Sequence, residues 1–294
     1  MQVVFGANGR AGGEIARALL ERGEAVRVVL RQPEHRERWI ARGADVAMVD
    51  IVDADAVAAA LKGALGAFLL NPTPRSGDPY AHAQEVGTAL AHALHAAQLP
   101  KAVVLSSIGA QHASGTGVIA TLNQIEMLLE GTAPAITFLR SAYFVETWSE
   151  VAGTAVTEGV LPTFLEVTQK IPMVSTIDVG RTGAALLCEN WTGKRIVELS
   201  GPEDWSASDV AMVFAKLLGH PVEPIFVPSE ERSAILTKDG IDNKAAEGLL
   251  AMYEGIANGR FVREDGNEQR RGVVSLTAAV ERILSPSRTF TVRT

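Results

Sequence analysis

The chain has 294 residues, of which 47% are hydrophobic, enough for one large domain or for a domain with a smaller partner. Its 27 basic and 34 acidic residues give a net charge of −7, which excludes direct nucleic-acid binding as the main role because no basic excess could neutralise phosphates. A single cysteine excludes an intramolecular disulfide, no apolar run could span a membrane, and no signal peptide is recognisable. A soluble, cytoplasmic α/β protein is expected.

The first dozen residues predict a dinucleotide site. An apolar run at residues 2–5 predicts a strand, a glycine-rich turn follows, and an amphipathic helix is expected at residues 13–22. Glycines at the turn remove the Cβ atoms that would keep a diphosphate away from the N–H groups and dipole at the helix N-terminus. The cofactor-binding residues predicted here are Gly6, Asn8, Gly9, Arg10, Ala11 and Gly12. The alternative is a tight turn that binds nothing.

The end of the second strand indicates which dinucleotide is bound. This strand is expected at residues 25–30 and is followed by Arg31. An acidic residue here favours NAD, whereas an arginine suits the 2′-phosphate of NADP. Arg10 could converge on the same phosphate. We therefore predict that NADP(H) is preferred and that NAD(H) is possible; the alternative is that both arginines are solvated surface charges.

The third strand, expected at residues 45–49, carries the predicted adenine contacts. Asp50 directly follows it and could accept a hydrogen bond from the adenine amino group, while Ile51 packs on the ring. The alternative for Asp50 is a turn residue without a ligand. Asp53 is expected to cap the helix that comes next.

The same alternation continues and predicts the fold class. Further strands are expected at residues 67–70, 101–105 and 135–139, and helices at 79–98 and 117–130. Strand and helix alternating at this spacing indicate an α/β fold with a parallel, doubly wound sheet. His82, His92 and His95 lie on one expected helix without a carboxylate–histidine motif, so no metal site is predicted.

Two loops at the carboxyl edge of this sheet complete the predicted cofactor site. Asn71 and Pro72 follow the fourth strand in a proline-stiffened loop, and Ser106 and Ser107 follow the fifth strand. The serine hydroxyls are expected to face the nicotinamide. Tyr143, after the sixth strand, is expected to shape the pocket rather than to donate a proton, and its alternative is packing between two lobes.

Several stretches together resemble the NmrA-like group of atypical short-chain dehydrogenases/reductases. They cover nearly the whole chain and include residues 6–12, 29–33, 105–107, 125–129, 136–146, 175–180, 199–203 and 217–222. The resemblance implies a Rossmann domain with a smaller, mostly helical C-terminal lobe. Residues 1–150 would form the NAD(P)-binding domain, with residues 174–200 returning to it. Residues 151–173 and 201–294 would form the substrate-binding lobe.

Within this division, residues 196–199 are expected to be the last strand of the sheet, and residues 206–219 a helix capped by Ser206. Residues 223–228 are expected to be extended, residues 244–256 helical, and the tail at 285–294 loosely ordered.

The proton donors of ordinary relatives are absent. No tyrosine has a lysine four residues later, and Leu122 stands where many NmrA-like reductases carry lysine or histidine. A quinone tolerates this loss, because it accepts hydride readily and water can supply its proton. We therefore expect hydride transfer from NADPH to a small flat acceptor in a cleft between the lobes, in a monomer or homodimer. The alternative is a non-catalytic NAD(P)-binding redox sensor or regulatory protein, and an epimerase is disfavoured for lack of evident proton-transfer residues.

Overall fold

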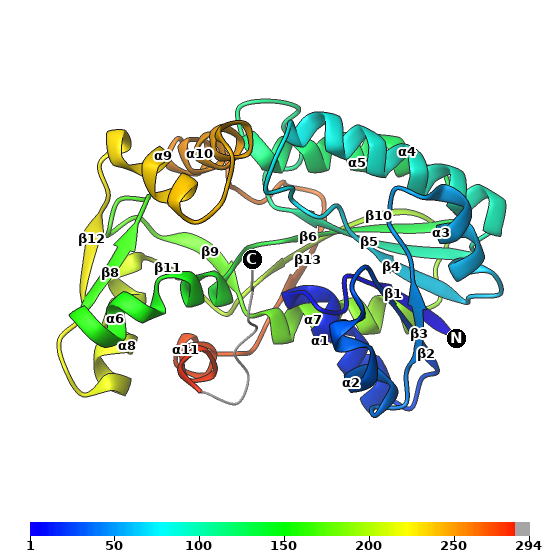
Figure 1. Ribbon diagram of the computed structural model, residues 1–294, viewed down its shortest axis with the longest axis horizontal. Coiled ribbons are helices and arrows are strands. Elements are labelled where there is room, and N and C mark those ends of the chain that lie inside the picture. The colour runs from blue at the N-terminus through cyan, green and yellow to red at the C-terminus, as the bar shows by residue number, and fades with distance from the viewer. Residues whose placement is uncertain (286–294) are drawn as a thin grey trace.

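The computed structural model describes residues 1–285, and within them the chain forms an eight-stranded central sheet (Figure 1). The strand order is β13-β10-β6-β5-β4-β1-β2-β3. Every neighbouring pair is parallel. The strands are β1 Gln2–Phe5, β2 Val26–Leu30, β3 Asp45–Met48, β4 Gly66–Leu69, β5 Lys101–Ser107, β6 Ala135–Ser141, β10 Gly193–Ser200 and β13 Glu268–Arg271. The predicted doubly wound α/β fold is confirmed.

Helices cover both faces of this sheet, which is why its central strands are continuous apolar runs. On one face lie α3 (Ala54–Leu61), α4 (Pro79–Ala97) and α5 (Ala120–Leu129). On the other lie α1 (Arg10–Glu21), α2 (Arg36–Ile40) and α7 (Thr176–Cys188). Phe5 and Phe68 point into opposite layers of the core and are almost fully buried. The 3-10 turn η1 (Pro33–His35) and helix α2 were not expected from the sequence.

A second lobe packs beyond the carboxyl edge of the sheet (Figure 1). Its strands pair as β12-β8 and β11-β9-β7. The elements between and within the two parts are η2 Gly117–Ile119, β7 Tyr143–Phe144, η3 Val145–Glu150, α6 Ala152–Glu158, β8 Val160–Thr163, β9 Ile171–Val174, β11 Asp204–Trp205, α8 Ala207–Leu218, β12 Glu223–Phe226, α9 Ser229–Lys238, α10 Asn243–Ala257 and α11 Leu276–Leu284.

Local signals in this lobe are read correctly from the sequence. Ser206 caps α8 in a reciprocal capping box with Asp209, and Gly219 ends the helix in the left-handed conformation. The extended segment after residue 222 pairs with β8, and the expected helix at 244–256 is α10. The tail expected to be loosely ordered lies, apart from Ser285, outside the described residues.

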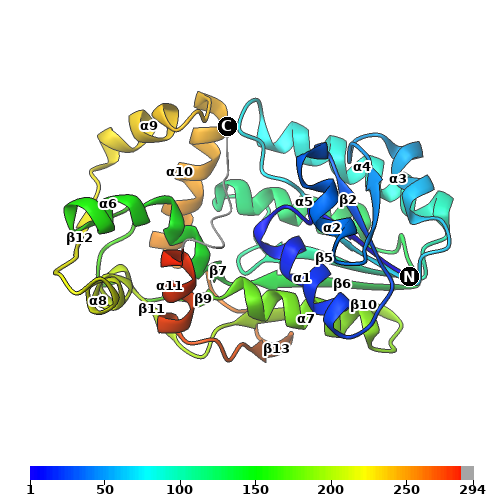
Figure 2. The same ribbon diagram turned by 60° about the horizontal axis from the view of Figure 1, so that its bottom comes forward.

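The expectation that residues 196–199 form the last strand of the sheet is wrong. β13 comes from the C-terminal part of the chain and lies beside β10 at the outer edge, as Figure 2 shows. Its sequence, Glu-Gln-Arg-Arg, has no apolar alternation, and it is held instead by backbone pairing and by ion pairs such as Arg270–Glu189 and Arg195–Glu268. A charged edge strand of this kind resists pairing with other molecules but gives no strand signal in the sequence.

Candidate functional site

A cavity of about 650 Å³ opens at the carboxyl ends of β1 to β4. It brings together six of the predicted cofactor residues, namely Gly6, Asn8, Arg31, Asp50, Ile51 and Pro72. The loop after β4 adds residues 73–76, and His82 of α4 completes the lining. Its volume lies within the range of small-molecule sites, and its place at the strand ends is where open α/β sheets bind ligands.

Two glycines of the turn, Gly6 and Gly12, are required by close packing behind this cavity. Gly6 has a φ of +66°, and a Cβ there would lie 2.4 Å from Leu70 Cδ2. A Cβ on Gly12 would lie 2.4 Å from the Gly6 carbonyl oxygen. The first turn of α1, including Ala11, therefore approaches the end of β1 as closely as backbone allows. Asn8 is fixed beside the turn because its Oδ1 accepts a hydrogen bond from Trp39 Nε1 at 3.1 Å.

The N-terminus of α1 is left uncapped. Gly9 precedes it in an extended conformation, no side chain caps the helix, and its first turn has no acidic residue. In residues 1–285, α2, α5, α6 and α9 also lack a side-chain cap, whereas six helices are capped by Asp53, Asp78, Ser175, Ser206, Asp242 and Ser275. The first N–H groups of α1 thus lack an intrahelical or side-chain acceptor, which is the arrangement that binds a phosphate.

Arg10 of the glycine turn is engaged by a segment outside the cavity. Its guanidinium is turned toward η3, where Nη2 donates to Glu150 Oε1 at 2.8 Å, and Thr147 and Ser149 lie nearby. It does not line the cavity, and its convergence with Arg31 on one phosphate stays a prediction. The carboxylate that pairs with it lies 140 residues away in sequence. Arg31 is exposed at the cavity wall, and Arg75 lines the same cavity.

The residues expected at the nicotinamide end lie outside the lining of this cavity. The Ser106 hydroxyl is buried and donates to Glu126 Oε1 at 2.5 Å, so it is already engaged. The Ser107 hydroxyl donates to the Ile108 carbonyl at 2.9 Å. Asn71 Nδ2 lies 3.4 Å from Thr121 Oγ1, while its Oδ1 is buried and has no hydrogen-bond partner within residues 1–285. A buried unpartnered oxygen of this kind is a ready acceptor for a ligand donor.

Two tyrosines from different parts of the chain meet near Arg10. The hydroxyls of Tyr143 on β7 and Tyr253 on α10 are 3.3 Å apart, and both side chains are half-buried. Burial raises the pKa of Tyr143 well above its usual value, and burial also raises the pKa of Tyr253. Both phenols therefore stay protonated at neutral pH. Sequence reasoning missed Tyr253, which has the spacing of an apolar helix position.

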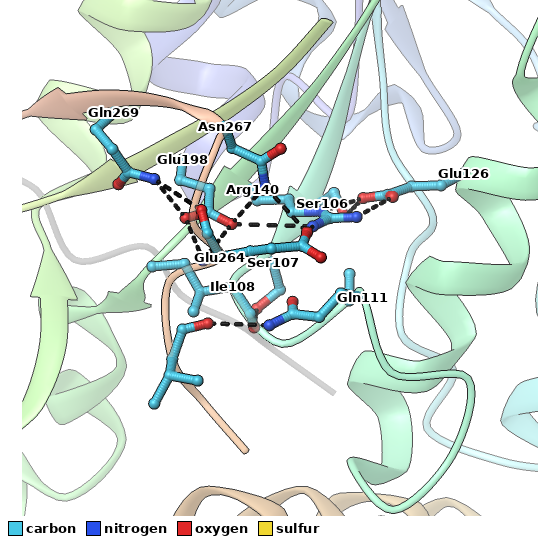
Figure 3. Close-up of polar contacts among 12 residues, drawn as sticks. Ser106, Ser107, Ile108, Gln111, Glu126, Arg140, Glu198, Glu264, Asn267 and Gln269 are labelled. Carbon is cyan, nitrogen blue, oxygen red and sulfur yellow. Dashed lines mark hydrogen bonds and ion pairs between the residues drawn. The ribbon is translucent and has the colours of Figure 1, made fainter. Parts of the chain in front are cut away.

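Arg140 joins the sheet to the segment that precedes β13 (Figure 3). It is 4% exposed, and its Nε and Nη2 donate to the two oxygens of Glu126 at 2.9 and 2.7 Å. Its Nη1 donates to Glu264 at 2.8 Å. A bidentate pair with this burial fixes the strand β6 against α5.

Glu198 completes this buried cluster from β10. Its carboxylate is fully buried and lies 3.9 Å from Arg140 Nη1. Three uncharged donors satisfy it: the backbone N–H of Glu264, Asn267 Nδ2 and Gln269 Nε2. The cluster holds the returning chain in place and does not line the cavity.

Two further observations concern metals and membranes. Residues 1–285 contain no group of three or more histidine, cysteine, aspartate or glutamate side chains arranged to hold a metal ion. In the same part of the chain, no helix combines the length and apolar character needed to cross a membrane.

Comparison with known families now bears on this geometry. The NmrA-like family matches residues 2–277, nearly the whole chain. The chain belongs to the NmrA-like family. Among curated relatives of this NmrA-like protein, the NAD(P)H azoreductase of Xenophilus azovorans is 22% identical over 254 residues, which is 86% of each chain. Quinone oxidoreductase 2 of Escherichia coli (strain K12) is 22% identical over 263 residues, 88% of this chain and 89% of that protein.

Solved structures share the fold over almost the full length. The NADPH complex of the E. coli NADPH-dependent quinone oxidoreductase QOR2 superposes with a TM-score of 0.78 at 21% identity, covering 97% of this chain and 100% of that one. The NADP(H) complex of Citrobacter sp. triphenylmethane reductase gives a TM-score of 0.78 at 19% identity, covering 96% and 99%.

Proposed function

We propose that this protein is an NADPH-dependent oxidoreductase that transfers a hydride to a small flat acceptor such as a quinone. The observation that carries the proposal is the cavity beside the uncapped N-terminus of α1. The turn that links β1 to this helix is so tightly packed that Gly6 and Gly12 leave no room for a Cβ. Membership of the NmrA-like family supports it, as do relatives named for reduction of azo compounds, quinones and triphenylmethane dyes.

The residues around the cavity can be assigned to the successive parts of a dinucleotide. The N–H groups at the start of α1 would hold the diphosphate. Asp50 and Ile51 would flank the adenine, with Arg31 at the 2′-phosphate. In this proposal residues 1–150, 174–200 and also 268–271 form the cofactor-binding domain, and the remaining segments form the lobe that closes the acceptor site.

The acceptor would lie where the two lobes meet, against Tyr143 and Tyr253. When bound, the nicotinamide supplies a hydride, and a quinone that accepts it takes one proton from solvent to become the hydroquinone. Two neutral phenols that share one hydrogen bond leave one O–H free, and this group would hold a carbonyl oxygen of the acceptor in place. Phe144 beside Tyr143 would help to exclude water.

Replacing Arg31 with aspartate should weaken NADPH binding at least about tenfold more than NADH binding, because the carboxylate repels the 2′-phosphate and can accept from ribose hydroxyls. Fluorescence titration of both cofactors measures this. Arg36, exposed on α2 and outside the cavity lining, gives the control variant Arg36→Asp. Equal losses for both cofactors in Arg31→Asp would contradict a 2′-phosphate contact.

Turnover is tested by following NADPH oxidation against a panel of quinones and flat dyes, with the Gly9→Val protein as the blank. We expect oxidation with quinones that is absent in the blank, and a several-fold rise in KM for quinones in Tyr253→Phe. Tight NADPH binding without oxidation of any acceptor would contradict the reductase function and leave the redox-sensor function. The lack of a proton donor at Leu122 favours this alternative.

A further inference from the structure

The second lobe forms hydrogen bonds with the loop that follows β4. The Gly77 N–H donates to Asp242 Oδ2 at 2.5 Å, and the Asp242 N–H donates to the Arg75 carbonyl at 2.9 Å. The Arg75 guanidinium donates in turn to the Asp239 carbonyl. These contacts join two segments about 165 residues apart in sequence. They form a two-way clasp between residues 75–77 and the turn 239–242 that separates α9 from α10.

Asp242 serves two partners with its two oxygens. Oδ1 accepts from the Ala245 N–H at 2.9 Å and caps α10, while Oδ2 accepts from Gly77. Hydrogen bonds from the Ala245 and Gly77 backbone N–H groups lower the pKa of Asp242, so the carboxylate is charged at neutral pH. The cap alone would need only one oxygen, and the second is committed to the loop.

The gripped loop is a wall of the cavity. Pro72 to Ser76 all line it, opposite the ends of β2 and β3. The prolines at 72 and 74 restrict the loop at its start, and Asp78 fixes its end by capping α4 through Tyr80. With both ends fixed, the clasp decides where the middle of the loop lies relative to Arg31 and Ile51.

We infer that Asp242 is a positioning residue for the cofactor: by clasping residues 75–77 it holds the loop closed over the adenosine half of a bound NADP(H), so that the second lobe completes the cofactor site. This inference rests on the proposed function. The clasp makes cofactor release depend on the second lobe, because the loop can withdraw only when the hydrogen bonds to Asp242 break. Helix α10 begins at this clasp and also carries Tyr253, so one element reaches both the cofactor loop and the Tyr143–Tyr253 pair.

The test uses Asp242→Asn and Asp242→Ser. Asparagine and serine are both good N-caps, so α10 should keep its cap. Neither offers a second oxygen to the Gly77 N–H. We expect NADPH to dissociate about tenfold faster in stopped-flow displacement. Adenosine 2′,5′-bisphosphate should lose affinity by a similar factor, and nicotinamide mononucleotide should lose none. Hydrogen exchange at Gly77 should become faster.

Ser275→Ala, which removes the cap of α11, is the control and should leave all four readouts unchanged.

Two results would overturn the inference, and they are distinguishable. Wild-type protein that binds NADPH, with dissociation unchanged in both Asp242 variants, would overturn the clasp alone. Equal losses for adenosine bisphosphate and nicotinamide mononucleotide would do the same, since they indicate general damage. Wild-type protein that binds none of these nucleotides would overturn the proposed function and the clasp together.

Discussion

Replacing Gly9 with valine should abolish NADPH binding, with Kd raised more than about a hundredfold, in a protein that still folds. Gly9 has φ −84° and ψ 176°, a conformation open to valine, and a Cβ there would meet only the Gly6 carbonyl oxygen at 3.2 Å. The added side chain would stand at the N-terminus of α1, where the diphosphate must approach the N–H groups. Fluorescence titration and a thermal melt measure the two parts of this result.

Gly12→Val provides the contrast. Its Cβ would lie 2.4 Å from the Gly6 carbonyl oxygen and 2.5 Å from that of Phe5, so backbone has to move. This variant should lose about 2 kcal/mol or more of folding free energy, whereas Gly9→Val should lose much less. NADPH affinity near the wild-type value in a folded Gly9→Val protein would refute the role of the glycine turn.

Replacing Arg140 with leucine should lower the free energy of unfolding by about 3–5 kcal/mol, the usual cost of leaving buried charges without their partner. Glu126 is 7% exposed and Glu198 is fully buried, and both face the Arg140 guanidinium. Urea denaturation followed by circular dichroism gives the value. NADPH binding by the protein that remains folded should persist, because the cluster does not line the cavity.

The matched control for this change is Arg263→Leu. Arg263 lies in the same returning segment, but it is partly exposed; its guanidinium is 3.5 Å from Asp204 and donates to Ser200 Oγ at 3.0 Å. Its loss should cost about 1–2 kcal/mol, for one exposed ion pair and one hydrogen bond. Similar losses in the two variants would show that the buried cluster contributes no more than a surface pair.

The central fold is predictable because its signals are local. Residues 2–5, 26–30 and 135–139 are apolar runs that both helical layers bury, and the first of them is followed by α1, a helix of recognisable period. β13 is the counterexample. Its Glu-Gln-Arg-Arg sequence becomes a strand only because β10 offers a free edge and Glu189 offers a charge. Nothing within those residues indicates that neighbour.

The site residues also fall into a group whose position sequence order predicts and a group whose position it does not. Arg31, Asp50 and Pro72 line one cavity because each ends a parallel strand, a consequence of topology that sequence order gives directly. The pairs Arg10–Glu150, Tyr143–Tyr253 and Gly77–Asp242 join residues separated by 140, 110 and 165 positions. Their geometry depends on how the second lobe packs on the first, and no local pattern encodes it.

The late arrival of β13 has a consequence for synthesis on the ribosome. Residues 193–200 emerge long before residues 268–271, so the nascent sheet has an unprotected edge, with the fully buried residues Val197 and Leu199 on its last strand, while the second lobe is made. The charged strand that shields that edge is translated only after β11, α8, β12, α9 and α10. A chain that stops anywhere before residue 268 would therefore keep the edge of β10 unpaired, and this edge would be prone to aggregation.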